Sequence, residues 1–165
     1  MQFYSNTMPF TIIHGLISYF AVCLFSRDKR LRLLAFAAGI LPDLDALGIL
    51  FGMDYYYQFH RTLFHPLLYA IVFAIPISFA LNKFLKIPKI KSFIVIAVAF
   101  ALHIATDLLF TSWPIRVFWP FSQQQFTFPY LEQFNSELAV VLLLLFAAQI
   151  GLGGMNKRKQ NKLFD

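Results

Sequence analysis

The feature that most constrains the fold of this chain is the length of its apolar segments. Five stretches approach the roughly 20 apolar residues that an α-helix needs to cross a bilayer. They lie at about residues 8–26, 33–53, 64–82, 90–112 and 136–155. Inside a bilayer, helices of this length satisfy all of their own backbone hydrogen bonds. The sequence therefore predicts an all-α protein, a polytopic membrane bundle of about five transmembrane or partly embedded helices.

The composition supports this fold class. Hydrophobic residues make up 59% of the 165 residues and charged residues 13%, against about 25% charged residues in soluble domains. No linker or repeat divides the chain, so we expect a single integral membrane domain over residues 1–165. Its final transmembrane helix is predicted at about 136–155, followed by a basic tail at 156–165.

Three of the stretches are irregular. The first contains His14 and is the weakest candidate for a full span, so a half-buried or re-entrant segment is the alternative. The second contains Gly39 and Pro42, which predict a kinked or broken helix. In the third, His65 directly precedes Pro66, and a residue before proline is disfavoured in the helical conformation. We therefore expect His65 on the entry loop and Pro66 at the opening of the helix.

The basic residues predict an orientation. Twelve of the fourteen Lys and Arg residues lie in the segments 27–32, 83–91 and 157–162. Five alternating spans place these segments on one side, and the positive-inside rule makes that side cytoplasmic. The N-terminus is then outside, with the first stretch as an uncleaved anchor. Topology and anionic lipid account for the net charge of +6, so no nucleic-acid partner is expected.

Several polar residues interrupt the apolar stretches. An Asp near the centre of a membrane helix costs about 2.5–3.5 kcal/mol, so something must compensate for it. With the predicted orientation, all four histidines fall at or above the outer leaflet, close to three aspartates and one arginine. The residues concerned are His14, Asp43, Asp45, His60, Arg61, His65, His103 and Asp107. Imidazole beside carboxylate predicts a metal centre that faces the outer side.

The spacing of these residues fits metal ligation. His103 and Asp107 are four residues apart and share one face of a helix, while Asp43 and Asp45 offer two carboxylates on a bent backbone. Mixed imidazole and carboxylate ligands suit Zn²⁺, with Mn²⁺ or Fe²⁺ as alternatives. Four to six donors exceed the usual three of one catalytic zinc site, so one or two ions are expected. The predicted ligands are His14, Asp43, Asp45, His65, His103 and Asp107.

Each element also has a purely structural interpretation. His14 can be an interhelical hydrogen-bonding group, and His103 with Asp107 can be a mutually neutralising pair. Asp43 can cap a broken helix, and His60 with Arg61 can belong to a solvated loop. Their joint placement on one side favours the metal centre.

The order of these residues resembles the YdjM-like family of bacterial inner-membrane, metal-dependent hydrolases. The resemblance covers about residues 10–122, which would form the hydrolase-like core. It is carried by His14, Gly39-Ile-Leu-Pro42-Asp43-Leu-Asp45, His60-Arg61-Thr-Leu-Phe-His65, His103-Ile-Ala-Thr-Asp107 and Trp119-Pro120-Phe121. That family is distantly similar to the zinc-dependent phospholipase C and nuclease P1 superfamily, α-helical enzymes that cut phosphate esters.

The resemblance implies roles for these residues. Asp45, His65, His103 and Asp107 would surround one metal, and Asp107 would bridge to a second ion held by His14. Asp43 would be a further ligand or a base, and Arg61 would contact a phosphate oxygen.

The sequence thus predicts a membrane-embedded hydrolase in the bacterial inner membrane. The catalytic residues would be Asp43, His60 and Arg61, and the substrate a phosphate ester of a lipid or amphiphile that enters from the outer leaflet. The alternatives are a transporter or channel for metal ions or protons, which also places carboxylates and histidines on broken helices, and a metal-stabilised scaffold.

Overall fold

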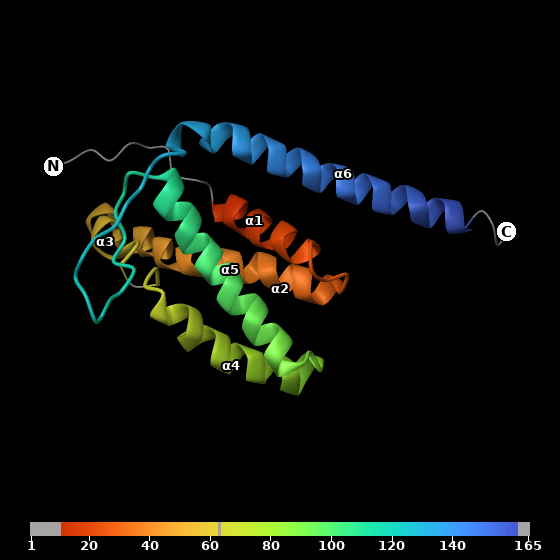
Figure 1. Cartoon of the computed structure of the whole chain (residues 1–165), viewed down its shortest axis with the longest axis horizontal. Helices are drawn as coiled ribbons and strands as arrows, with labels where there is room; N and C mark the ends of the chain where they lie inside the picture. The colour runs from red at the N-terminus through yellow and green to blue at the C-terminus, as the bar shows by residue number, and fades with distance from the viewer. Residues whose placement is uncertain (1–10, 63, 162–165) are drawn as a thin grey trace.

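A computed structural model describes residues 11–62 and 64–161, without the side chains of 58 and 153–161. In this part of the chain there are six α-helices and two 3₁₀ segments (Figure 1). They are α1 (Thr11–Cys23), α2 (Lys29–Ile40), η1 (Leu41–Phe51), α3 (Met53–Phe59), α4 (Leu68–Leu85), α5 (Lys89–Phe110), η2 (Glu132–Phe134) and α6 (Asn135–Asn161). The predicted all-α class is confirmed.

Four segments are long and apolar enough to cross a membrane. They are Lys29–Phe51, Leu68–Leu85, Lys89–Phe110 and Glu132–Leu152, and they correspond to four of the five predicted stretches. The first predicted stretch forms α1, which has 13 residues and is shorter than a span. The break predicted in the second stretch is present, because α2 gives way to η1 at Leu41.

The helix ends follow local sequence signals. Asp28 caps α2 by accepting a hydrogen bond from the backbone N–H of Arg30 at 2.9 Å, and the bonds from Arg30 lower the pKa of this carboxyl. Pro66 precedes the first turn of α4, and His65 lies in the connection before it, as predicted. At the other end of α4, Lys86 adopts a left-handed conformation with φ of 57°.

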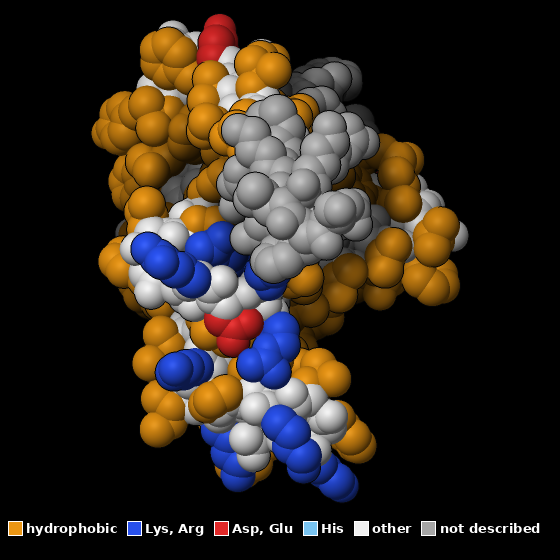
Figure 2. All heavy atoms as spheres, turned by 90° about the vertical axis from the view of Figure 1, so that its right-hand side faces the viewer, with side chains coloured by type: hydrophobic (Ala, Val, Ile, Leu, Met, Phe, Trp, Pro, Cys, Tyr) orange, Lys and Arg blue, Asp and Glu red, His pale blue; other side chains and the backbone are white. Residues whose placement is uncertain are grey.

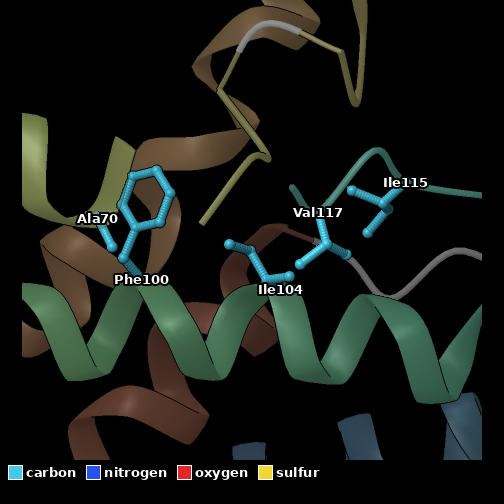
Figure 3. Packing of buried hydrophobic residues seen from close by; sticks show 5 residues of the cluster. All are labelled: Ala70, Phe100, Ile104, Ile115 and Val117. Carbon is cyan, nitrogen blue, oxygen red and sulfur yellow. The ribbon is translucent and has the colours of Figure 1, made fainter. Parts of the chain in front are cut away.

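Helix α5 is the centre of the bundle. It packs against α1, α2 and α4, while α6 lies along α1 (Figure 1). Phe100 and Ile104 of α5 form a core cluster with Ala70 of α4 and with Ile115 and Val117 from the segment that follows α5 (Figure 3). That segment therefore covers one end of the bundle.

Basic residues gather at the opposite end. The α1–α2 and α4–α5 connections lie there together (Figure 1), and Figure 2 shows Lys and Arg side chains clustered on this face. The four spans alternate in direction in the described part of the chain (Figure 1), so the segments 27–32 and 83–91 lie on one side even though α1 is short. The assignment of this side to the cytoplasm stays a prediction.

The close approach of α1 to α2 depends on Gly39. A Cβ atom at this position would lie 2.5 Å from Ser18 Oγ and 2.8 Å from the backbone oxygen of His14. We expect Gly39→Ala to lower the free energy of unfolding by about 1–3 kcal/mol, because the two helices must move apart. Unfolding in detergent, followed by circular dichroism, measures this change.

Gly151→Ala is the matched control, since its added Cβ meets nothing within 4 Å. Equal stability of the two variants would contradict the packing argument.

Candidate metal centre

Four of the predicted ligands come together in the interior of the bundle. Asp43 of η1, His65 of the connection before α4, and His103 and Asp107 of α5 each contribute one donor atom, and these atoms lie within 4.8 Å of one another. The side chains of His65, His103 and Asp107 are fully buried, whereas that of Asp43 is 8% exposed. Asp43 therefore borders the accessible side of the cluster.

The spacing of the donor atoms fits a single ion. His65 Nε2 lies 3.3 Å from both His103 Nε2 and Asp107 Oδ2, and the latter two atoms are 3.6 Å apart. Asp43 Oδ1 lies 3.5 Å from His103 Nε2 and 3.7 Å from His65 Nε2. These five distances match the edges of a tetrahedron whose centre is about 2.0–2.3 Å from each corner, a range that includes zinc–nitrogen and zinc–oxygen bond lengths. The distance between the donor atoms of Asp43 and Asp107 lies within 4.8 Å.

The 3₁₀ winding of η1 lets Asp43 and Asp45 serve the same region. Side chains two residues apart point about 160° apart on an α-helix, but only about 120° apart on a 3₁₀ helix. Asp43 accordingly faces the Nε2 side of His65, which points into the cluster. Asp45 contacts the Nδ1 side of the same ring. Pro42 is the second residue of the segment, where its missing N–H is tolerated.

Hydrogen bonds fix both histidines in the form that can bind a metal. His103 Nδ1 donates to the backbone oxygen of Gly39 at 2.7 Å, and His65 Nδ1 donates to Asp45 Oδ2 at 3.2 Å. In each ring the Nε2 atom is thereby left to face the cluster. Carboxylate or carbonyl partners of this kind are the usual support of metal-bound histidines.

One of the atoms that face the centre has no hydrogen-bond partner among the described residues. Asp107 Oδ2 is buried and accepts no hydrogen bond from the described residues, which is costly unless a cation or proton lies beside it. His65 lies outside the spans. Burial lowers the pKa of its imidazole, but the carboxylates of Asp107, Asp43 and Asp45 outweigh that effect and raise the pKa well above its usual value. The donor set therefore fits a divalent cation, which would displace a proton on binding.

The other predicted site residues surround this group. Asp45 is buried and receives hydrogen bonds from His60 Nδ1 at 2.6 Å and from His65, so it orients both rings. His14 Nε2 lies 3.3 Å from Asp107 Oδ1, and its Nδ1 donates to Thr106 Oγ1 at 2.7 Å. His14 and Asp45 thus contact the donors of the cluster from outside it.

Arg61 is also buried, at 3% exposure. Its Nη2 donates to Asp107 Oδ1 at 2.9 Å, and its Nη1 donates to the backbone oxygen of Trp113 at 3.0 Å and to Thr111 Oγ1 at 3.4 Å. Nε is the atom of the group with no hydrogen-bond partner among the described residues. The guanidinium fork is therefore directed at protein atoms.

Sequence reasoning missed several supporting residues. Thr106 and the Gly39 carbonyl lie within the motifs that were singled out, but neither was assigned a role. Trp113 carries no local signal, yet its ring contacts those of His60 and Tyr56. Burial raises the pKa of the Tyr56 phenol, so this side chain stays neutral next to the cluster.

Comparison with known proteins gives one match. The family model described as YdjM inner membrane protein matches residues 8–164, which is nearly the whole chain. No curated protein and no solved structure matches. The matched range includes the four spans and every residue of the cluster, in agreement with the resemblance noted from the motifs. The chain therefore belongs to the YdjM inner membrane protein family and is an inner membrane protein.

Proposed function

We propose that this protein is a metal-dependent hydrolase that cleaves a phosphate ester of a lipid or amphiphile at the outer leaflet. The observation that carries the proposal is the convergence of Asp43, His65, His103 and Asp107 in the bundle interior. Such a group is expensive inside a membrane protein unless it has a function. The phosphate ester comes from the family resemblance of the motifs and from the unpartnered Nε atom of Arg61 beside the cluster.

In this proposal, His65, His103 and Asp107 hold the ion. Two histidines and one carboxylate are a common ligand set of catalytic zinc sites, which keep a further position open. A divalent ion bound there would supply Lewis-acid activation of water and of the scissile group. Asp43, on the accessible side, would orient the attacking water and accept its proton.

The remaining residues support the reaction. Asp45 holds His65 through Nδ1 and shares its other oxygen with His60, so His60 acts on the centre through Asp45. Arg61 Nε would donate a hydrogen bond to an oxygen of the phosphoryl group. Water adds to phosphorus, the ester P–O bond breaks, and the leaving alcohol takes up a proton.

The described buried polar residues that lie away from the metal centre do not form a path for ions, which argues against transport. Among the described side chains, the buried polar residues away from the centre and its contacts are Ser18, Ser78 and Ser92. Each hydroxyl donates to a backbone carbonyl, of Ala99, Ile75 and Pro88 respectively. The described residues thus provide no line of charged groups from the centre to the basic end.

Reconstitution in liposomes tests the proposal directly. The purified protein is placed in vesicles of phosphatidylethanolamine and phosphatidylglycerol that contain a metal-sensitive dye, and Zn²⁺ or Mn²⁺ is added outside. We expect release of phosphorylated headgroup or of diacylglycerol, and of nitrophenol from added bis(p-nitrophenyl) phosphate, with no change in dye signal. His103→Ala is the inactive control.

A dye response without any product would indicate a metal transporter and would contradict the hydrolase proposal. Bound metal with neither product nor flux would favour a metal-stabilised scaffold.

A further inference from the structure

Arg61 has an unusual conformation for a buried residue. Its φ is 66°, in the left-handed region, which among the described non-glycine residues only Lys86 shares. This conformation is uncommon for a long side chain and costs free energy. A buried guanidinium is also costly unless it is paired. The surroundings must therefore hold Arg61 in place.

Arg61 contacts the carboxylates of both Asp45 and Asp107. Its backbone N–H donates to Asp45 Oδ2 at 3.0 Å, and its Nη2 donates to Asp107 Oδ1 at 2.9 Å. The guanidinium also lies over the Trp113 ring, 5.5 Å from its centroid. The left-handed turn allows one residue to make the backbone and the side-chain contact at once.

These contacts divide the two oxygens of Asp107 between different partners. Oδ1 receives the Arg61 bond, and His14 Nε2 lies 3.3 Å away. Oδ2 faces His65 and His103 and has no hydrogen bond. Binding of one ion through both oxygens would break a charge-assisted bond, which is among the strong ones. A second cation at Oδ1 would lie beside the guanidinium charge.

We infer that Arg61 also positions Asp107: it restricts this side chain to one metal-binding oxygen and limits the centre to a single divalent ion. The inference rests on the proposed metal centre, but not on the reaction. The family resemblance implies a second ion that Asp107 would bridge to the first. In this arrangement the guanidinium of Arg61 contacts Asp107 Oδ1 instead of that ion.

Titration with Co²⁺ tests the inference, because its visible absorption reports the coordination number. Wild-type protein should bind one equivalent, with the intense bands of low coordination. In Arg61→Gln, Asp107 Oδ1 loses its charge-assisted bond and keeps only the His14 contact, so Oδ1 can turn to the ion. The bands should then weaken and the affinity should fall about 10–100-fold, the usual effect of losing an outer-shell partner. Arg61→Lys, which keeps the charge, should recover part of the affinity.

Lys86→Gln is the matched control, since Lys86 shares the left-handed conformation but follows the last residue of α4, in the α4–α5 connection. It should leave stoichiometry, spectrum and affinity unchanged. Two equivalents or none in the wild type, or an unchanged spectrum and affinity in Arg61→Gln, would overturn the inference. The wild-type stoichiometry decides the ion number even if an Arg61 variant fails to fold. A catalytically inert protein that binds one Co²⁺ would refute the hydrolase and leave the role of Arg61 intact.

Discussion

Alanine at His103 or at Asp107 should remove both the bound metal and the activity of the purified protein. Each substitution deletes one of the fully buried donors, and the two remaining donors of the proposed ligand set cannot hold a divalent ion tightly. We expect elemental analysis of the detergent-purified wild type to find about one equivalent of zinc or manganese, and none in either variant. Phosphoester hydrolysis should fall to background in parallel.

The matched control is Ser92→Ala, which changes a buried polar residue of the same helix far from the centre. It should keep its metal. Circular dichroism and elution volume show whether each variant retains the helical fold. A variant that loses the metal but keeps full activity would remove the metal from the mechanism, and full metal content in both variants would place the ion elsewhere.

Asp43→Asn should separate metal binding from turnover. Asparagine keeps the volume of the side chain but cannot take up a proton, and the three fully buried donors are left in place. We expect the metal content to stay near that of the wild type while the turnover number falls about 10²–10⁴-fold, the usual contribution of a general base. Metal titration and steady-state kinetics on the same preparation measure the two effects.

Asp54→Asn provides the control, because Asp54 is an exposed carboxylate of α3. It should change neither quantity. If Asp43→Asn loses its metal instead, the centre is a closed four-ligand site, and the open position that hydrolysis needs is absent.

Local sequence patterns predicted much of the fold and of the centre. The spacing of His103 and Asp107 places them on one face of a helix, and both donate to the cluster. Pro66 confines His65 to a connection, and Gly39 with Pro42 marks the point where α2 ends. Each of these results depends on contacts within a few residues of the chain or on simple helical geometry.

Other features depend on tertiary contacts that the sequence does not display. Nothing in the sequence of residues 41–51 distinguishes a 3₁₀ helix from an α-helix. The different contacts of Asp43 and Asp45 were therefore not predicted. Residues like Arg61 rarely adopt positive φ, and its pairing with Asp107 joins segments 46 residues apart. The 13 residues of α1 are also fewer than those of the stretch at about 8–26 that suggested a span.

The attachment of α6 has a consequence for how this protein can vary. Helix α6 packs on α1 through Ala139 and Leu142, whereas the four donor atoms come from η1, the connection before α4, and α5. Helix α6 thus contributes no donor atom, whereas the spans Lys29–Phe51 and Lys89–Phe110 both anchor the protein and carry donors. The length and lipid-facing surface of α6 can therefore vary while the geometry of the donor atoms is preserved.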